Sequence, residues 1–165
     1  TAVHPENYKT MTQALLIEID AANRVLVRVL DVDAGKYVKE YLIDNVASPV
    51  KLKYNHDARK RLSTAPVFGD GAELTVKKSA AQYEVTVPQA KAFGDNEVYL
   101  YRISIKNSSG KEVYSDRELS QYYFAEVPES ITFKGIYLGA DSYTVTVVAE
   151  DVWGNLSAPL TTVIG

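Results

Sequence analysis

The sequence predicts an all-β protein, in which a small antiparallel β-meander is followed by a β-sandwich. Apolar and polar residues alternate with a period of two along most of the chain, which is typical of strands with one buried face. Helical periodicity is nearly absent. Gly, Asn, Asp, Ser and Pro separate the alternating runs, as expected of turns between short strands.

The meander is predicted in the first 44 residues. In "ALLIEID" one face carries Leu15, Ile17 and Ile19, and after the turn "AAN" the run "RVLVRVLD" alternates in the same way with Val25, Val27 and Val29. The turn "DVDAG" then leads into a third strand, Tyr37 to Asp44, with a more polar exposed side. These three runs predict one antiparallel sheet.

The alternation stops between Asn45 and Gly71, where Pro and Gly residues and a cluster of Lys and Arg occur. A structureless stretch of this length is unusual inside a compact domain, so we expect a domain boundary in it. We therefore predict that residues 1–66 form the three-stranded unit plus a connector, and that residues 67–165 form the sandwich.

The second half of the chain contains about seven short strand-like runs, the number expected of a β-sandwich of about 100 residues. The runs are "AELTVKK", "QYEVTVPQA", "NEVYLYRISIKN", "KEVYSDRELSQYYF", "SITFKG", "SYTVTVVAED" and "APLTTVI".

The last two runs form a predicted hairpin around the tight turn "VWGN", and we expect Trp153 to be partly exposed there. This hairpin resembles the F and G strands of a fibronectin type III domain, whose pattern is Tyr-x-Val-x-Val-x-Ala, then Gly, then Ser-x-Pro. "LYRISI" resembles strand C of that family, with Tyr101 and Ile103 directed inward. The residues that match the F and G pattern are Tyr143, Val145, Val147, Ala149, Gly154, Ser157 and Pro159.

The resemblance to fibronectin type III domains covers Ala72 to Gly165 and implies the same fold. It also implies that the Tyr143 ring enters the core and that its hydroxyl bonds to backbone between Ile136 and Gly139. The family's usual core Trp on strand B is missing, because "YEVTVPQ" offers only Tyr83, Val85 and Val87. The segment before Tyr143 is also about one residue longer than the usual tyrosine corner.

The first half of the chain resembles the end of a calcineurin-like metallophosphoesterase of the exported type found in gut Bacteroidetes. That family closes its catalytic domain with a Gln-x-Leu-Leu-Ile-Glu strand, an Arg-Val-x-Val strand and a Tyr...Ala-Arg connector. The matching positions are Gln13, Leu15, Leu16, Ile17, Glu18, Arg24, Val25, Val27, Tyr54, Ala58, Arg59, Ala65 and Pro66.

This second resemblance implies a non-catalytic accessory region of an exported hydrolase, whose divalent metals and Gly-His-x-His motif lie upstream of Thr1. The lack of an initiator Met and of a signal peptide agrees with such a cut end. We predict no catalytic, cofactor-binding or metal-binding residues in this chain, and its expected partner is the parent catalytic domain.

Composition excludes several other functions. The chain has no cysteine, which removes disulfides, thiolate metal sites and cysteine nucleophiles. Its formal charge of -3 gives no overall attraction to nucleic acid or to an anionic membrane. No apolar run approaches the roughly 20 residues needed to span a bilayer.

Isolated features that suggest a catalytic or metal site have simpler interpretations. His4 lacks any metal-motif context and is expected to be a solvent-exposed residue near a terminus. "DVDAG" lacks the later acidic ligands of a calcium loop and is expected to be a plain turn. His56 and Asp57, with Ser63 or Ser79, would be needed for a hydrolytic set, but no nucleophile motif accompanies them.

Two segments have features of binding surfaces. The basic run "KLKYNHDARKRL" is expected to be a solvated connector whose Arg59 and Arg61 pair with acidic residues, and the alternative is a single-strand nucleic-acid site. Core and edge packing is expected for Tyr99, Tyr101 and Tyr143. The remaining aromatic candidates for contact with a glycan or a protein partner are Tyr122, Tyr123, Phe124 and Trp153. A stand-alone extracellular module that binds such a partner is the alternative function, and a free-standing enzyme is a third.

Overall fold

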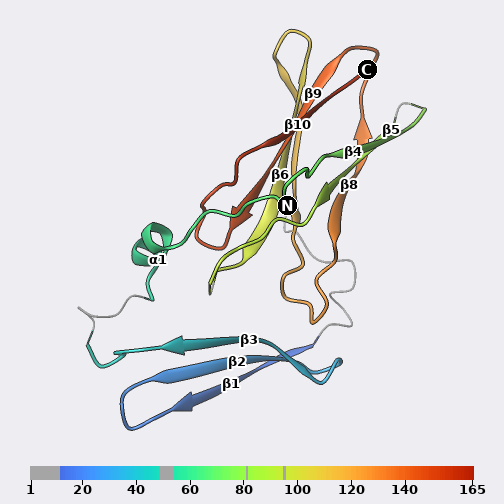
Figure 1. The fold of residues 1–165 in the computed structure, drawn as a ribbon. Coiled ribbons are helices and arrows are strands. Elements are labelled where there is room, and N and C mark those ends of the chain that lie inside the picture. The colour runs from blue at the N-terminus through green and yellow to red at the C-terminus, as the bar shows by residue number, and fades with distance from the viewer. Residues whose placement is uncertain (1–11, 49–53, 81, 95) are drawn as a thin grey trace. The chain divides into compact units, whose positions relative to one another are not determined.

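The computed structural model describes residues 12–48, 54–80, 82–94 and 96–165 (Figure 1). The described chain is all-β apart from one short helix, which confirms the predicted fold class. It divides into two compact units. The sandwich unit comprises Thr64–Tyr122 and Pro128–Gly165, and the meander unit comprises Ala2–Ser63 together with Tyr123–Val127. The chain therefore passes from the meander unit to the sandwich unit between Ser63 and Thr64, and it returns to the meander unit for Tyr123–Val127.

The meander unit contains the three predicted strands, β1 (Gln13–Ile19), β2 (Val25–Asp31) and β3 (Lys36–Ile43), in the antiparallel order β1-β2-β3. The first turn forms because Asp20 Oδ1 accepts hydrogen bonds from the backbone N–H groups of Ala22 (2.9 Å) and Arg24 (3.0 Å). Asn23 adopts a positive φ of 59° in this turn, a conformation that asparagine tolerates better than most residues.

One side of this sheet is mostly apolar, because the register places apolar residues opposite one another across all three strands in two rows. In the next row Leu15 and Val29 are apolar, and Lys39 lies opposite Val29. None of these residues is buried, and Leu15, Ile17 and Ile19 are 64%, 56% and 73% exposed. We call this set the apolar sheet face; it consists of Leu15, Ile17, Ile19, Val25, Val27, Val29, Tyr41 and Ile43.

The opposite side of the sheet has a charged centre. Arg28 lies between Glu18 and Glu40, at N–O distances of 2.9 Å and 3.0 Å. This central ion-pair network distinguishes the second side from the apolar sheet face.

The connector contains a helix, α1 (His56–Leu62), so the expectation of a structureless stretch was wrong. Asn55 caps the helix, since its side chain accepts a hydrogen bond from Ala58 N at 3.0 Å. Asp57 lies in the first turn and Arg59 to Arg61 in the last, which suits the helix dipole. Helical periodicity did not reveal α1 because it has only seven residues.

The sandwich unit consists of two antiparallel sheets. The three-stranded sheet has the order β4-β5-β8, formed by β4 (Thr75–Ser79), β5 (Gln82–Pro88) and β8 (Ser130–Tyr137). The four-stranded sheet has the order β10-β9-β6-β7, formed by β10 (Leu160–Ile164), β9 (Tyr143–Asp151), β6 (Val98–Asn107) and β7 (Glu112–Leu119). The expected strands F and G (β9 and β10) are neighbours, strand C (β6) lies beside F, and strand B (β5) is in the other sheet. This is the fibronectin type III-like sandwich that the sequence predicts.

Both sheets contribute one face to a common core. Every residue that the sequence directs inward on the expected B, C and F strands is buried, except Tyr99. The confirmed core residues are Tyr83, Val85, Val87, Tyr101, Ile103, Tyr143, Val145, Val147 and Ala149, each at most 6% exposed.

Of the two expectations for Tyr143, a buried ring and a hydroxyl bonded to the corner backbone, only the first is confirmed. Its ring is buried, with 6% of the residue exposed, and its hydroxyl lies 3.8 Å from the position of a Cβ built on Gly139. However, among the described residues the hydroxyl makes no hydrogen bond, so the expected bond to the corner backbone is absent. The longer corner before Tyr143 is consistent with this difference.

Candidate functional site

One end of the sandwich, which we call the loop end, gathers segments 89–94, 96–97, 120–122 and 152–159. β6 begins there and β9 ends there, since Val98 pairs with Asp151. Backbone bonds hold the segments together: Val152 N donates to Glu97 O (3.1 Å), and Ser120 N donates to Tyr99 O (3.0 Å). Side chains from distant parts of the sequence are therefore brought close to one another.

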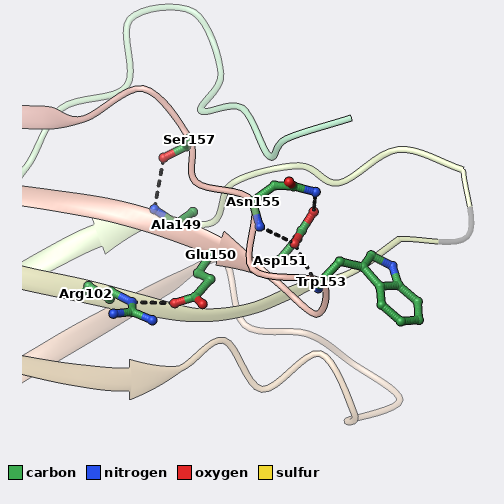
Figure 2. Close-up of polar contacts among 7 residues, drawn as sticks. All are labelled: Arg102, Ala149, Glu150, Asp151, Trp153, Asn155 and Ser157. Carbon is green, nitrogen blue, oxygen red and sulfur yellow. Dashed lines mark hydrogen bonds and ion pairs between the residues drawn. The ribbon is translucent and has the colours of Figure 1, made fainter. Parts of the chain in front are cut away.

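A buried carboxylate organises the loop end (Figure 2). Asp151 is 1% exposed and accepts hydrogen bonds from Trp153 N (2.9 Å), Asn155 N (2.7 Å) and Asn155 Nδ2 (2.9 Å), which Figure 2 shows. It also accepts a hydrogen bond from Asn96 Nδ2 (2.8 Å). A carboxylate offers about four acceptor positions, so these donors occupy them. The arrangement makes Asp151 a structural residue that holds the turn after β9.

The Asp151 bonds extend to both sides of the turn. Asn96 Oδ1 accepts from Glu97 N (3.0 Å), so the same side chain fixes the start of the segment that enters β6. Gly154 has φ of 82° and donates its N–H to Asp151 O at 3.0 Å, a conformation that favours glycine. Beyond the turn, Ser157 Oγ accepts from Ala149 N (2.9 Å).

A second polar network lies beside the first. The Tyr101 hydroxyl accepts a hydrogen bond from Ala90 N (2.7 Å) and donates to Gln89 Oε1. Gln89 Nε2 donates to Ser120 O (2.6 Å), and Ser120 Oγ donates to Val98 O. The buried Tyr101 and Ser120 side chains and the half-buried Gln89 side chain thus connect the end of β5 with the start of β6 and the end of β7.

We predict that this network weakens at alkaline pH. Burial raises the pKa of Tyr101 to about 12, and the hydrogen bond from Ala90 N opposes that rise. Because the pKa is higher in the folded state, Tyr101 contributes stability that is fully present below its unfolded value of about 10 and is lost as pH rises towards 12. Urea melts from pH 8 to 11.5 should show a smaller alkaline loss for Tyr101→Phe than for the wild type. If the free energy of unfolding falls with pH at the same slope in Tyr101→Phe and in the wild type, the prediction is contradicted.

Two predicted contact residues lie at the loop end. Trp153 is half-buried in the turn after β9, as expected, and Figure 2 shows its indole directed away from the Asp151 carboxylate. Tyr122 is half-buried and lies edge-on to Tyr99, with ring centroids 6.4 Å apart and an interplanar angle of 74°. Tyr99 is 42% exposed, and β6 lies inside its sheet between β9 and β7, so the expected core or edge packing of Tyr99 was wrong.

The other two predicted contact residues, Tyr123 and Phe124, belong to the meander unit. "QYYF" forms no strand, because β7 ends at Leu119, and the rings of Tyr123 and Phe124 lie 5.1 Å apart. Tyr123 O accepts a hydrogen bond from Gln13 Nε2 (2.5 Å), and Glu126 pairs with Lys36 at 3.8 Å. Tyr123–Val127 thus contacts the sheet at the row of Gln13, Asp31 and Lys36.

The structure places the candidate hydrolytic residues on α1 and at the end of β4. His56 Nδ1 lies 3.4 Å from Asp57 Oδ1 on the surface of α1, and their side chains are 66% and 94% exposed. Ser63 is the C-cap of α1, whereas Ser79 ends β4 in the other unit. His4 lies outside the described residues.

The remaining candidates have structural roles. "DVDAG" is a turn, in which Asp31 Oδ1 accepts from Ala34 N at 3.0 Å. In the connector, Arg59 lies over the Tyr54 ring at 5.0 Å, and Arg61 Nε donates to Asp57 O at 3.3 Å. Across the described ranges, no three His, Cys, Asp or Glu side chains are grouped so that they could hold a metal ion. No helix in these ranges is long and apolar enough to cross a membrane.

Comparisons with known proteins return structural neighbours only. No family model matches the chain, and no curated protein matches it. Among solved structures, "Myokine structure" is 20% identical with a TM-score of 0.36, and the match covers 60% of this chain and 94% of the other. Domains A168–A170 of titin are 13% identical with a TM-score of 0.37. That match covers 90% of this chain, which spans 48% of the titin fragment.

Sequence reasoning missed the residues that hold the loop end together. Asp151 is followed closely by Gly154 and Asn155, and an Asp before a Gly-Asn turn is a signal for a carboxylate that accepts the turn's N–H groups. No local signal points to Asn96 or Ser120, because their partners are far away in sequence.

Proposed function

We propose that this chain is the non-catalytic C-terminal accessory region of an exported metallophosphoesterase. In this proposal the meander unit completes the parent's catalytic domain, and the fibronectin type III-like sandwich supports, orients or docks the enzyme. The observation that carries the proposal is the apolar sheet face.

The described part of the meander unit has almost no buried core. Asp31 is the only described residue of this unit that is buried, while Leu15, Ile17 and Ile19 are each more than half exposed. A contiguous exposed apolar surface usually marks an interaction site, and each buried aliphatic side chain contributes about 1.5–3 kcal/mol. Such a sheet is therefore expected to be covered by another part of a larger domain.

The sequence resemblance indicates what that larger domain is. Residues 13 to 18 of β1 match the family's Gln-x-Leu-Leu-Ile-Glu strand, which closes a phosphoesterase domain. Two-metal hydrolysis needs several Asp, His and Asn ligands that converge on the ions. The proposal places these ligands, and the divalent metals, upstream in the parent protein.

The proposal predicts that this chain alone does not hydrolyse p-nitrophenyl phosphate or its bis ester in the presence of manganese. A longer protein that includes the preceding encoded sequence should do so, and that sequence should contain Gly-His-x-His and Asn-His motifs. Chelator-sensitive hydrolysis by the chain alone would overturn the proposal, as would a preceding sequence without these motifs.

A matched pair of variants tests the role of the apolar sheet face. Ile17 lies on this face, whereas its neighbour Leu16 lies on the opposite side, across from Arg28. In the longer protein, Ile17→Glu should destabilise the catalytic domain by about 2–3 kcal/mol, because a charge is buried. Leu16→Glu should cost less than about 0.5 kcal/mol. Equal effects of both variants on thermal stability would show that the face is not covered by the parent domain.

The alternative is a stand-alone extracellular module that binds a glycan or a protein. The observation in its favour is the exposed ring of Tyr99 beside Tyr122 at the loop end. Specific signals of the isolated chain on a glycan array would favour this function over the accessory role.

A further inference from the structure

We propose that Glu97, Tyr99 and Tyr122 form a recognition site for the cationic side chain of a protein partner, an arginine or a lysine. We call this set the aromatic-acid site. It does not depend on the parent enzyme proposed above, because all three residues belong to the sandwich unit.

The geometry suits a cation. The rings of Tyr99 and Tyr122 are nearly perpendicular, at 74°, with centroids 6.4 Å apart. In this T-shaped contact one ring presents its edge to the other. An aromatic face attracts a cation that lies within about 6 Å of its centroid. The 42% exposure of Tyr99 leaves its ring open to a partner.

The local electrostatics also favour positive charge. Burial raises the pKa of Tyr122, and the Tyr99 hydroxyl and the Glu97 carboxylate raise it further, so the carboxylate lies within electrostatic range of the Tyr122 hydroxyl. A carboxylate accepts up to about four hydrogen bonds, so Glu97 can retain protein contacts and still accept from a guanidinium or an ammonium group.

Hydrogen bonds fix the backbone that carries these side chains. Glu97 N donates to Asn96 Oδ1 (3.0 Å), and Glu97 O accepts from Val152 N (3.1 Å). Ser120 fixes the two tyrosines, because its N–H donates to Tyr99 O (3.0 Å) and its Oγ accepts from Tyr122 N (3.3 Å). A preorganised site loses little conformational entropy on binding, which raises its affinity.

A sugar fits this arrangement less well. A pyranose ring stacks on one aromatic plane, or between parallel planes, whereas the second ring here is turned by 74°. A partner's arginine can instead lie against one ring and meet the carboxylate with its N–H groups. We therefore expect the positive charge of the ligand, and not a ring that can stack, to determine binding at the aromatic-acid site.

The test is an NMR titration of the whole chain with the peptide acetyl-Gly-Arg-Gly-amide and with its citrulline counterpart, which has a similar shape without the charge. The arginine peptide should give saturable shifts at the amides of Glu97, Tyr99 and Tyr122. The citrulline peptide should bind roughly fivefold or more weakly, and added salt should weaken only the arginine peptide.

Variants assign the contribution of each group. Glu97→Gln and Tyr99→Leu should each weaken binding of the arginine peptide roughly threefold to tenfold, whereas Tyr99→Phe keeps the ring and should retain most of the affinity. The controls are Glu73→Gln and Tyr137→Leu, which alter an exposed acid and a 70% exposed tyrosine elsewhere on the sandwich and should change nothing. Unchanged dispersion of the remaining amide signals verifies the fold.

Three results would overturn the proposal. One is equal binding of the arginine and citrulline peptides. Another is affinity that survives both Glu97→Gln and Tyr99→Leu. The third is a response of these amides to a neutral oligosaccharide such as cellotriose without a response to the arginine peptide, which would assign the surface to glycan.

Discussion

Replacement of Tyr143 by alanine is expected to destabilise the sandwich by about 3–5 kcal/mol, the usual cost of an aromatic-to-alanine cavity. The ring begins β9 inside the core shared by both sheets, and the residue is 6% exposed. Urea melts followed by circular dichroism measure the loss. Tyr137→Ala is the matched control, since that side chain is 70% exposed and its removal should cost less than about 0.5 kcal/mol.

Tyr143→Phe separates the ring from the hydroxyl. Because the hydroxyl makes no hydrogen bond to a described residue, this change should cost less than about 1 kcal/mol. A loss as large as that of the alanine variant would mean that the hydroxyl has an essential partner. If the melting curves of Tyr143→Ala and Tyr143→Phe both overlay the wild-type curve, the core position of Tyr143 itself is contradicted.

Replacement of Asp151 by alanine should destabilise the sandwich by about 3–4 kcal/mol. The change removes the acceptor of the buried Asn96 amide and of the N–H groups of Trp153 and Asn155, and a buried donor without a partner costs about 1–3 kcal/mol. The individual costs do not add fully, because the donors form one network and the loop can relax.

The Asp151 prediction has a conservative variant and a local readout. Asp151→Asn keeps the shape but turns an NH₂ group towards donors, so about 2 kcal/mol should be lost. Trp153 fluorescence should report the loosened turn before global unfolding. Asp70→Asn, at an exposed turn position, is the control. A wild-type melting curve for Asp151→Ala would show that the turn is held without this carboxylate.

Alternation of apolar residues was sufficient to predict the strands of both units. The period of two assigns one face of each strand to the core, and this worked for β5, β9 and most of β6. It failed at Tyr99 because the pairing of β6 with β9 shifts between Val98 and Leu100. This irregularity turns Val98 and Tyr101 to the core, and strict alternation cannot include both.

For the aromatic candidates too, the sequence predicted some features correctly and missed others. A position in a hairpin connection, away from the inward strand positions, was enough to predict that Trp153 is partly exposed. Sequence proximity, however, grouped Tyr122 with Tyr123 and Phe124, although the chain passes from one compact unit to the other between residues 122 and 123. Which side chains share a surface depends on contacts between distant segments, such as that of Tyr122 with Tyr99.

The sequence by itself determined the all-β class, the meander, the strand order of the closing hairpin and the inward face of Tyr143, because these follow from local periodicity and turn chemistry. Only the tertiary structure decided that Asp151 is buried among neutral donors, since Asn96 reaches it from 55 residues away in sequence. The tertiary structure also decided that the apolar sheet face is exposed. Alternation identifies an apolar face, but the packing of the whole fold determines whether anything covers it.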